Sequence, residues 1–223
     1  IIIIKRIIFK IILILKNGEK FMKLRQMDKF IAHCDHYFGQ KNTNIFHMVN
    51  ENALHIDVLL YEPNENYPFW KLVTMGASDY TMPKKQTTFG FNNEYVMFVH
   101  KSVDLKDENV VDWYLDKLSS IGSFAYDNQV HITYGNSFDV KIRDEEEMVC
   151  CFIELPQIIR NSGFLRCKVG FFKTIICLQA VLLNKDEFEK LTEIGAENFS
   201  YWLYPENKEN EHFIVERVRS EKF

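Results

Sequence analysis

The chain has 223 residues, of which 47% are hydrophobic and 26% are charged, and its formal net charge at pH 7 is −4. This length fits one domain, and the composition is typical of a soluble globular protein. Residues 1–21 hold five basic residues and one acidic residue, so residues 22–223 hold 22 basic and 30 acidic residues and have a net charge of −8. A nucleic-acid-binding domain is expected to be basic, so this acidity argues against that class.

The first residues form an Ile-rich segment, IIIIKRIIFKIILILKNGEK, in which nine of the first fifteen residues are Ile. Lys5, Arg6 and Lys10 interrupt the apolar run, which is too short and too charged to span a membrane. It also lacks the unbroken apolar region and the cleavage site of a signal peptide. Because Met22 opens a well-formed helical pattern, we expect residues 1–21 to be an extension that is not part of the native protein; the alternative is a membrane-associating N-terminal segment.

Hydrophobic periodicity predicts the elements of the first half of the chain. Apolar residues at steps of three and four predict a helix over 22–38 that ends at Gly39. Alternation predicts a strand within 53–63, and a polar turn joins it to a second strand at 69–75, so the two are expected to form an antiparallel hairpin. A third strand is predicted at 94–100.

The second half predicts a helix over 109–121 that ends at Gly122, followed by β-rich runs at 148–155 and 171–183. Asn184 and Glu187 have the spacing of a capping box and open a last helix.

Strands and helices are mixed here without regular alternation. We therefore predict an α+β fold with a mixed, largely antiparallel sheet flanked by helices. The domain is expected to span residues 22–204, and residues 205–223 form a polar C-terminal tail.

The five cysteines are odd in number and include no C-x-x-C pair. A disulfide framework and a zinc knuckle are therefore disfavoured, and buried free thiols in a reducing cytosol are expected.

Two sequence features could carry chemistry. His33 and His36 lie one helical turn apart, which would place two metal ligands together, but a third ligand is lacking and the spacing alone is weak. His55 and Asp57 share one face of a strand and could form an acid–base pair, although a polar sheet face or a buried hydrogen-bonded histidine gives the same pattern. In an enzyme, the fold could also bring His33 or His131 near this pair.

The stretch KLVTMGAS, residues 71–78, runs from a strand into a glycine turn. It lacks the Lys-Ser/Thr pair of a phosphate-binding loop, and Thr74 and Ser78 have no evident base beside them. The sequence therefore predicts a buried strand turned by Gly76, with no catalytic residues, no metal and no cofactor.

In their order and spacing, several positions over residues 27–203 resemble the Suppressor of fused (SUFU) domain family. Two positions depart from the family pattern: Ala77 replaces a usual Met, and the sequence at 134–136 replaces a frequent Gly-His. The residues that carry the resemblance are His55, Asp57, Tyr61, Pro63, Thr74, Gly76, Ser78, Glu94, Trp113, Glu187 and Gly195.

This resemblance implies a single, non-enzymatic domain that binds a protein partner, as family members do when they hold an extended segment by strand addition. The chain has 20 Lys and 7 Arg, which suggests an AT-rich bacterial genome, and bacterial stand-alone members resemble immunity proteins of polymorphic toxin systems. We therefore expect a cytoplasmic immunity protein that neutralises a basic toxin domain, with Asp144, Glu145, Glu146 and Glu147 as partner-binding residues and no membrane contact of the core domain. The alternatives are a hydrolase-like enzyme that uses His55 and Asp57, and a scaffold that binds extended peptides.

Overall fold

The structure is a computed structural model of the chain. It describes residues 24–48, 54–83, 91–140, 148–159 and 161–204, so the segments 1–21 and 205–223 lie outside the described part.

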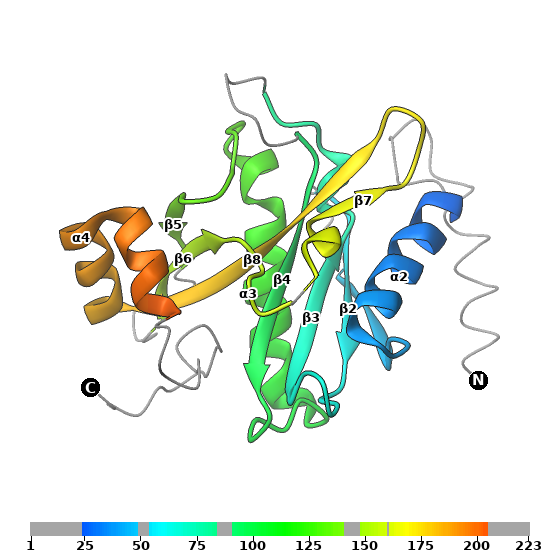
Figure 1. The fold of residues 1–223 in the computed structure, drawn as a ribbon, viewed down its shortest axis with the longest axis horizontal. Coiled ribbons are helices and arrows are strands. Elements are labelled where there is room, and N and C mark those ends of the chain that lie inside the picture. The colour runs from blue at the N-terminus through cyan, green and yellow to red at the C-terminus, as the bar shows by residue number, and fades with distance from the viewer. Residues whose placement is uncertain (1–23, 49–53, 84–90, 141–147, 160, 205–223) are drawn as a thin grey trace.

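An eight-stranded sheet forms the centre of the molecule, with the strand order β1-β2-β3-β4-β8-β6-β5 and with β7 paired to β8 (Figure 1). The neighbouring strands are antiparallel except for β4 and β8, which are parallel. The predicted α+β fold with a mixed, largely antiparallel sheet is therefore confirmed. The strands are β1 (Asn44–Met48), β2 (Ile56–Tyr61), β3 (Phe69–Met75), β4 (Asn93–His100), β5 (Ser137–Asp139), β6 (Met148–Glu154), β7 (Arg166–Lys168) and β8 (Thr174–Asn184).

In the described part of the chain, three α-helices cover this sheet, and two short 3₁₀ helices lie in its connections. One face packs on α3, and the other packs on α2 at one end of the sheet and on α4 at the opposite end. The helices are α2 (Leu24–Phe38), α3 (Glu108–Asp127), α4 (Lys185–Leu203), η1 (Ala77–Asp79) and η2 (Ser162–Leu165).

Alternation along the strands separates the two sides of the core. In β4, Tyr95 and Met97 pack on the α3 side, whereas Val96 and Phe98 pack on the α2 side. Successive side chains of a strand point to opposite faces, so a central strand that is covered on both sides is buried along its whole length. This is the case for β2 and β3, which are buried at every position.

Helix α2 ends where the sequence predicts, since Gly39 follows it with a positive φ of 67°. Phe30, Cys34 and Phe38 are its buried residues, spaced four apart on one face of the helix. They pack on the sheet beside Phe164 of η2.

Helix α3 is longer than predicted, because it continues through Gly122 to Asp127. Gly122 therefore lies inside the helix, where it faces the sheet, and does not end the helix. A Cβ at this position would lie 2.8 Å from Cδ1 of Ile56 and 3.4 Å from Cγ2 of Thr74, so a larger residue would require the Ile56 side chain to shift.

Helix α4 begins with the predicted capping box. The Asn184 side chain accepts a hydrogen bond from the Glu187 amide at 2.9 Å, and the Glu187 carboxylate accepts one from the Asn184 amide at 2.9 Å. The helix is broken at Gly195, whose φ of 78° and ψ of 161° are not helical. The break divides the helix into two segments, and Phe188 in the first segment is 39% exposed.

All five cysteines are free and buried, as the sequence predicts. Within the described ranges, no helix has the length and hydrophobicity needed to cross a membrane.

Candidate functional site

Several of the family-motif residues meet at one end of the sheet. Because β2, β3 and β4 are successive antiparallel strands, the start of β2, the end of β3 and the start of β4 lie at the same end. This end therefore carries His55, Asp57, Gly76 and Glu94, together with η1, which follows β3. We call the residues His55, Asp57, Thr74, Gly76, Ser78 and Glu94 the motif cluster.

The carboxylate of Glu94 is the centre of this cluster and is fully buried. It accepts hydrogen bonds from the Thr74 hydroxyl at 2.6 Å, the Gly76 amide at 2.8 Å and the Ser78 amide at 3.0 Å. The Thr74 hydroxyl in turn accepts a bond from the Tyr95 amide at 2.8 Å. The side chain of Glu94 thus supplies the acceptors that the strand-to-turn junction needs, because a buried amide without an acceptor would be costly.

Burial raises the pKa of Glu94 to about 7, although the hydrogen bonds from Thr74, Gly76 and Ser78 act in the opposite direction. The carboxyl group changes its charge close to neutral pH for this reason.

Gly76 has a φ of 126°, which L-residues rarely adopt. A Cβ here would lie 2.2 Å from the backbone carbonyl oxygen of His55, which cannot move away as a side chain could. The glycine of KLVTMGAS is therefore required for close packing of two backbone segments, and the prediction of a strand end turned by Gly76 fits this geometry.

His55 and Asp57, which the sequence places on one face, lie together with a second histidine. Oδ1 of Asp57 lies 3.1 Å from Nε2 of His55 and 2.8 Å from Nδ1 of His47. His47 stands opposite Asp57 on the edge strand β1. The sequence analysis did not identify β1 or His47; the signal was the β-prone run Asn44–Met48 just before a strand that begins with a His-x-Asp pattern.

Asp57 is only 1% exposed, whereas the side chains of His47 and His55 are 41% and 32% exposed. Burial alone would raise the pKa of Asp57, but its hydrogen bonds to His47 and His55 outweigh this effect and lower the pKa. The carboxylate is thus held ionised beside two accessible imidazoles, an arrangement that can orient an acid–base histidine or bind a metal ion.

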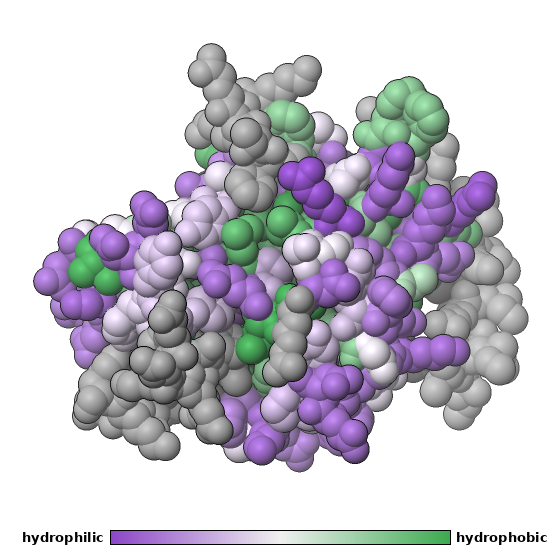
Figure 2. All heavy atoms as spheres, viewed as in Figure 1, coloured by the Kyte–Doolittle hydropathy of each residue, from purple (hydrophilic) through white to green (hydrophobic). Residues whose placement is uncertain are grey.

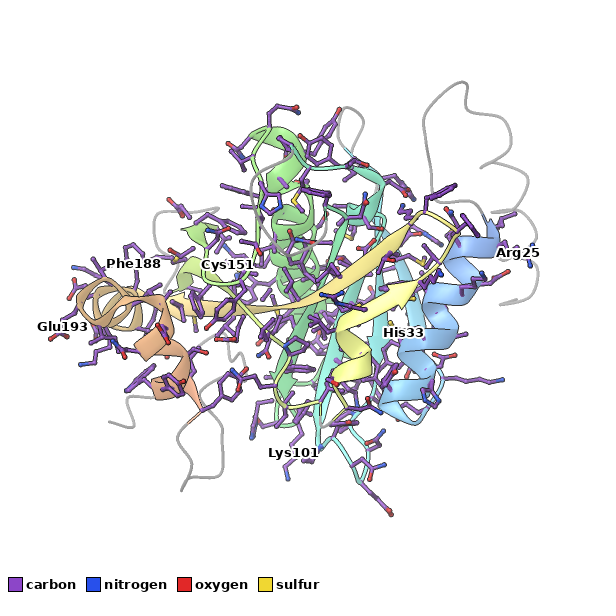
Figure 3. All side chains as sticks on the ribbon, turned by 45° about the horizontal axis from the view of Figure 1, so that its top comes forward. Arg25, His33, Lys101, Cys151, Phe188 and Glu193 are labelled. Carbon is purple, nitrogen blue, oxygen red and sulfur yellow. The ribbon has the colours of Figure 1, made fainter. Side chains whose placement is uncertain are left out.

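The other residues considered for chemistry are not part of this group. Thr74 and Ser78 are fully buried, so their hydroxyls are closed to a substrate. His33 lies on α2 and its Nε2 is 3.0 Å from the carbonyl oxygen of Phe164, on the flank that faces η2 (Figure 3). The buried His131 packs on the ring of Phe91.

The remaining residues of the sequence resemblance are spread over the fold. The Tyr61 hydroxyl donates to the Asp35 carboxylate of α2 at 2.9 Å, and Pro63 follows β2 in the turn to β3. Trp113 is half-buried on α3, while Glu187 and Gly195 shape α4 as described above. The predicted partner-binding residues Asp144, Glu145, Glu146 and Glu147 lie outside the described residues.

A second feature of this end is a pair of exposed aromatic residues between β7 and β8. Phe171 is 85% exposed and Phe172 is 95% exposed, and their ring centroids are 4.6 Å apart. They form the apolar knob at the upper right of Figure 2, where the turn stands out in Figure 1. We call Phe171 and Phe172 the hairpin tip.

The sequence analysis placed these residues in a strand over 171–183, which is wrong because β8 begins at Thr174. The preceding Gly170 was the signal, since a glycine beside an apolar run favours a turn.

The motif cluster and the hairpin tip are joined by an ion pair. Nζ of Lys173, next to the tip, lies 2.8 Å from Oδ1 of Asp79, which follows Ser78 in η1. The carbonyl of Lys173 also accepts bonds from the amides of Val169 and Gly170, at 3.2 Å each. The turn is thus closed at its base and attached to the junction that Gly76 and Glu94 build.

A comparison with family models matches residues 52–217 to the Suppressor of fused protein (SUFU) family. The chain belongs to the SUFU family. The match includes the whole motif cluster and the hairpin tip, whereas α2, β1 and therefore His47 precede it. A search of curated protein sequences finds no significant match.

Solved SUFU structures share the fold at low sequence identity. The chain of the Sufu–Fu complex is 14% identical with a TM-score of 0.62, over 87% of this chain and 91% of that one. A SUFU homologue from Neisseria gonorrhoeae is 11% identical with a TM-score of 0.59, over 89% of this chain and 97% of that one. Drosophila Suppressor of Fused is 15% identical with a TM-score of 0.59, and the match covers 85% of this chain and 48% of that one.

Proposed function

We propose that this SUFU-family chain is a non-enzymatic protein-binding domain that acts in the bacterial cytoplasm as an immunity protein and neutralises a cognate toxin. Membership of the family supports a protein-binding role, since one SUFU structure was solved as a complex with Fu. The bacterial homologue matched over 97% of its length supports a stand-alone bacterial domain.

The observation that carries the proposal is the hairpin tip. A phenylalanine side chain gains roughly 1.5–3 kcal/mol when it is fully buried, and two neighbouring ones that stay almost fully exposed forgo most of this gain in the isolated domain. Binding sites concentrate their energy in a few aromatic anchors that enter a pocket of the partner. Phe171 and Phe172 have the exposure and the proximity of such an anchor.

The attachment of the tip makes it suited to binding. Two backbone hydrogen bonds close the turn, and the Lys173–Asp79 pair ties it to η1. A preorganised loop loses less conformational entropy on association than a free one. The motif cluster supports binding indirectly, because it fixes η1 and with it Asp79.

The net negative charge of the chain indicates that the proposed partner is basic. The net charge of −4, or −8 without residues 1–21, favours a basic toxin such as a nuclease, because opposite charge speeds association. The apolar tip would then supply affinity, while the acidic surface directs the encounter.

Co-expression of the full chain with the product of a neighbouring toxin gene tests the proposal. We expect the chain to restore growth and to co-purify with the toxin. A double variant, Phe171→Ala with Phe172→Ala, should lose at least tenfold in affinity and fail to protect.

Tyr201→Ala is the matched control, because Tyr201 is another exposed aromatic residue, 72% exposed, but lies on α4 away from the tip. This variant should protect as well as the wild type. If the wild type gives no protection and does not co-purify with the toxin, the immunity role is contradicted. If the double variant protects fully, the hairpin tip is not part of the binding surface.

A scaffold that binds extended peptides is the second candidate, and the strand β1 favours it. Among the described strands, β1 pairs only with β2 and so presents an open edge to which a peptide could add. Amide hydrogen exchange separates the two modes. Strand addition should slow exchange along β1 when the partner binds, whereas docking on the tip should leave β1 unchanged and slow exchange at 169–173.

A further inference from the structure

The side chains of His47, His55 and Asp57 form a cluster that plays no part in the proposed toxin binding. Among the described residues it is the one group of three potential metal-ligating side chains whose ligand atoms all lie within 4.8 Å of one another. The histidines come from the edge strand β1 and from just before β2, and Asp57 lies between them in space.

The distances fit neighbouring positions around one ion. Histidine nitrogen and carboxylate oxygen bind zinc at about 2.0–2.2 Å, so adjacent ligand atoms of a tetrahedral ion are roughly 3.3 Å apart. Nδ1 of His47 and Nε2 of His55 lie 2.8 Å and 3.1 Å from Oδ1 of Asp57. Both rings are partly exposed, and both ligand nitrogens already lie beside the carboxylate oxygen.

Charge and access also fit a cation. Asp57 is buried between the two imidazoles, and its carboxylate would supply the negative charge of the site. The side chains of His47 and His55 are 41% and 32% exposed, so the cluster lies near the surface. The sequence cluster His33 to His36 lacks this geometry, because His33 is held at the Phe164 carbonyl.

We propose that His47 Nδ1, His55 Nε2 and Asp57 Oδ1 bind a late first-row divalent cation of the Zn²⁺ class, with water completing the coordination. Imidazole with one carboxylate is a donor set that suits zinc and its neighbours better than magnesium or calcium. Each neutral ring then keeps its proton on the nitrogen that faces away from the ion. The ion would join β1 to β2 at the open edge of the sheet, and the site is independent of a toxin partner.

His47 lies outside the residues matched by the family model, which begin at residue 52. The site therefore combines a histidine outside the matched residues with His55 and Asp57, which lie inside them.

Calorimetric titration of the full chain with ZnCl₂, after removal of metals with EDTA, tests the site. We expect one ion to bind per chain, and His47→Ala to weaken binding at least tenfold. His36→Ala is the matched control, because His36 is an exposed histidine on α2, and it should bind as the wild type does. Zinc at a hundredfold excess over Kd should also raise the Tm of the wild type by roughly 5–10 °C.

Cobalt provides a second measurement on the same proteins. Co²⁺ in a site of low coordination number gives visible absorption bands, which should appear with the wild type and with His36→Ala but not with Asp57→Asn. If Asp57→Asn does not fold, His47→Ala carries the test, because its exposed ring is not needed for packing. No saturable binding at 1:1 stoichiometry, or equal binding by His47→Ala, would overturn the proposal and leave the three residues as a hydrogen-bonded group.

Discussion

The motif cluster and the hairpin tip lie at the same end of the sheet but have opposite physical character. In the motif cluster a charged side chain, Glu94, is fully buried and is satisfied by three donors. In the hairpin tip two apolar side chains, Phe171 and Phe172, are almost fully exposed. The first region uses polar residues to build the fold, and the second leaves apolar surface for something outside it.

This contrast separates the family signature from the proposed function. Within the motif cluster, Thr74, Gly76 and Ser78 are hydrogen-bonded to Glu94, so replacing these residues should affect folding. The residues proposed for binding carry no motif, and their replacement should leave folding intact. Four variants test whether the two regions differ in this way.

Gly76→Ala should have the largest effect. The new Cβ would lie 2.2 Å from the His55 carbonyl oxygen at a backbone φ of 126°, so the junction has to move. We expect the free energy of unfolding to fall by at least about 4 kcal/mol, as measured by chemical denaturation. A loss below about 1 kcal/mol would mean that the junction is not packed as described.

Glu94→Gln should change the pH dependence of stability. The pKa of Glu94 is raised from 4.5 to about 7 in the fold, so the stability that its protonated form contributes is present below pH 4.5 and is lost as the pH rises through 7. The wild type should therefore lose up to roughly 3 kcal/mol relative to Glu94→Gln over this range. A difference between the two proteins that stays constant from pH 4.5 to 7.5 would contradict the assignment.

Gly195→Ala tests a positive-φ glycine without a clash. Its φ is 78°, but nothing lies within 4 Å of the Cβ position, so only backbone strain opposes the substitution. We expect a loss of about 1–3 kcal/mol, smaller than that of Gly76→Ala in the same denaturation experiment. A variant as unstable as Gly76→Ala would mean that the clash with His55 is not the cause of the difference.

Phe171→Ala with Phe172→Ala should have the smallest effect on stability. Exposed side chains have little packing to lose, so the free energy of unfolding should stay within about 0.5 kcal/mol of the wild type. The same protein is expected to lose partner binding. A stability loss above about 2 kcal/mol would instead make the tip part of the core.

The predicted bounds of an element were correct where its local sequence pattern alone sets them, and wrong where a tertiary contact sets them. β3 was predicted with its observed bounds, and β4 to within one residue, because their apolar runs are bounded by turn residues. The Asn184–Glu187 capping box was predicted because all its atoms are local. The end of α3 was wrong, since Gly122 serves a contact with Ile56 that is 66 positions away in the sequence.

The candidate site shows the same division. The family resemblance, the mixture of strands and helices, and the position of His55 and Asp57 on one face were predictable, because they follow from side-chain order and strand periodicity. The approach of His47 to this pair and the Lys173–Asp79 ion pair were not predictable, because they join residues from different parts of the fold. The same holds for the hydrogen bond by which Glu94 completes the turn of KLVTMGAS. These contacts depend on strand order and register, which long-range packing sets and which no local pattern encodes.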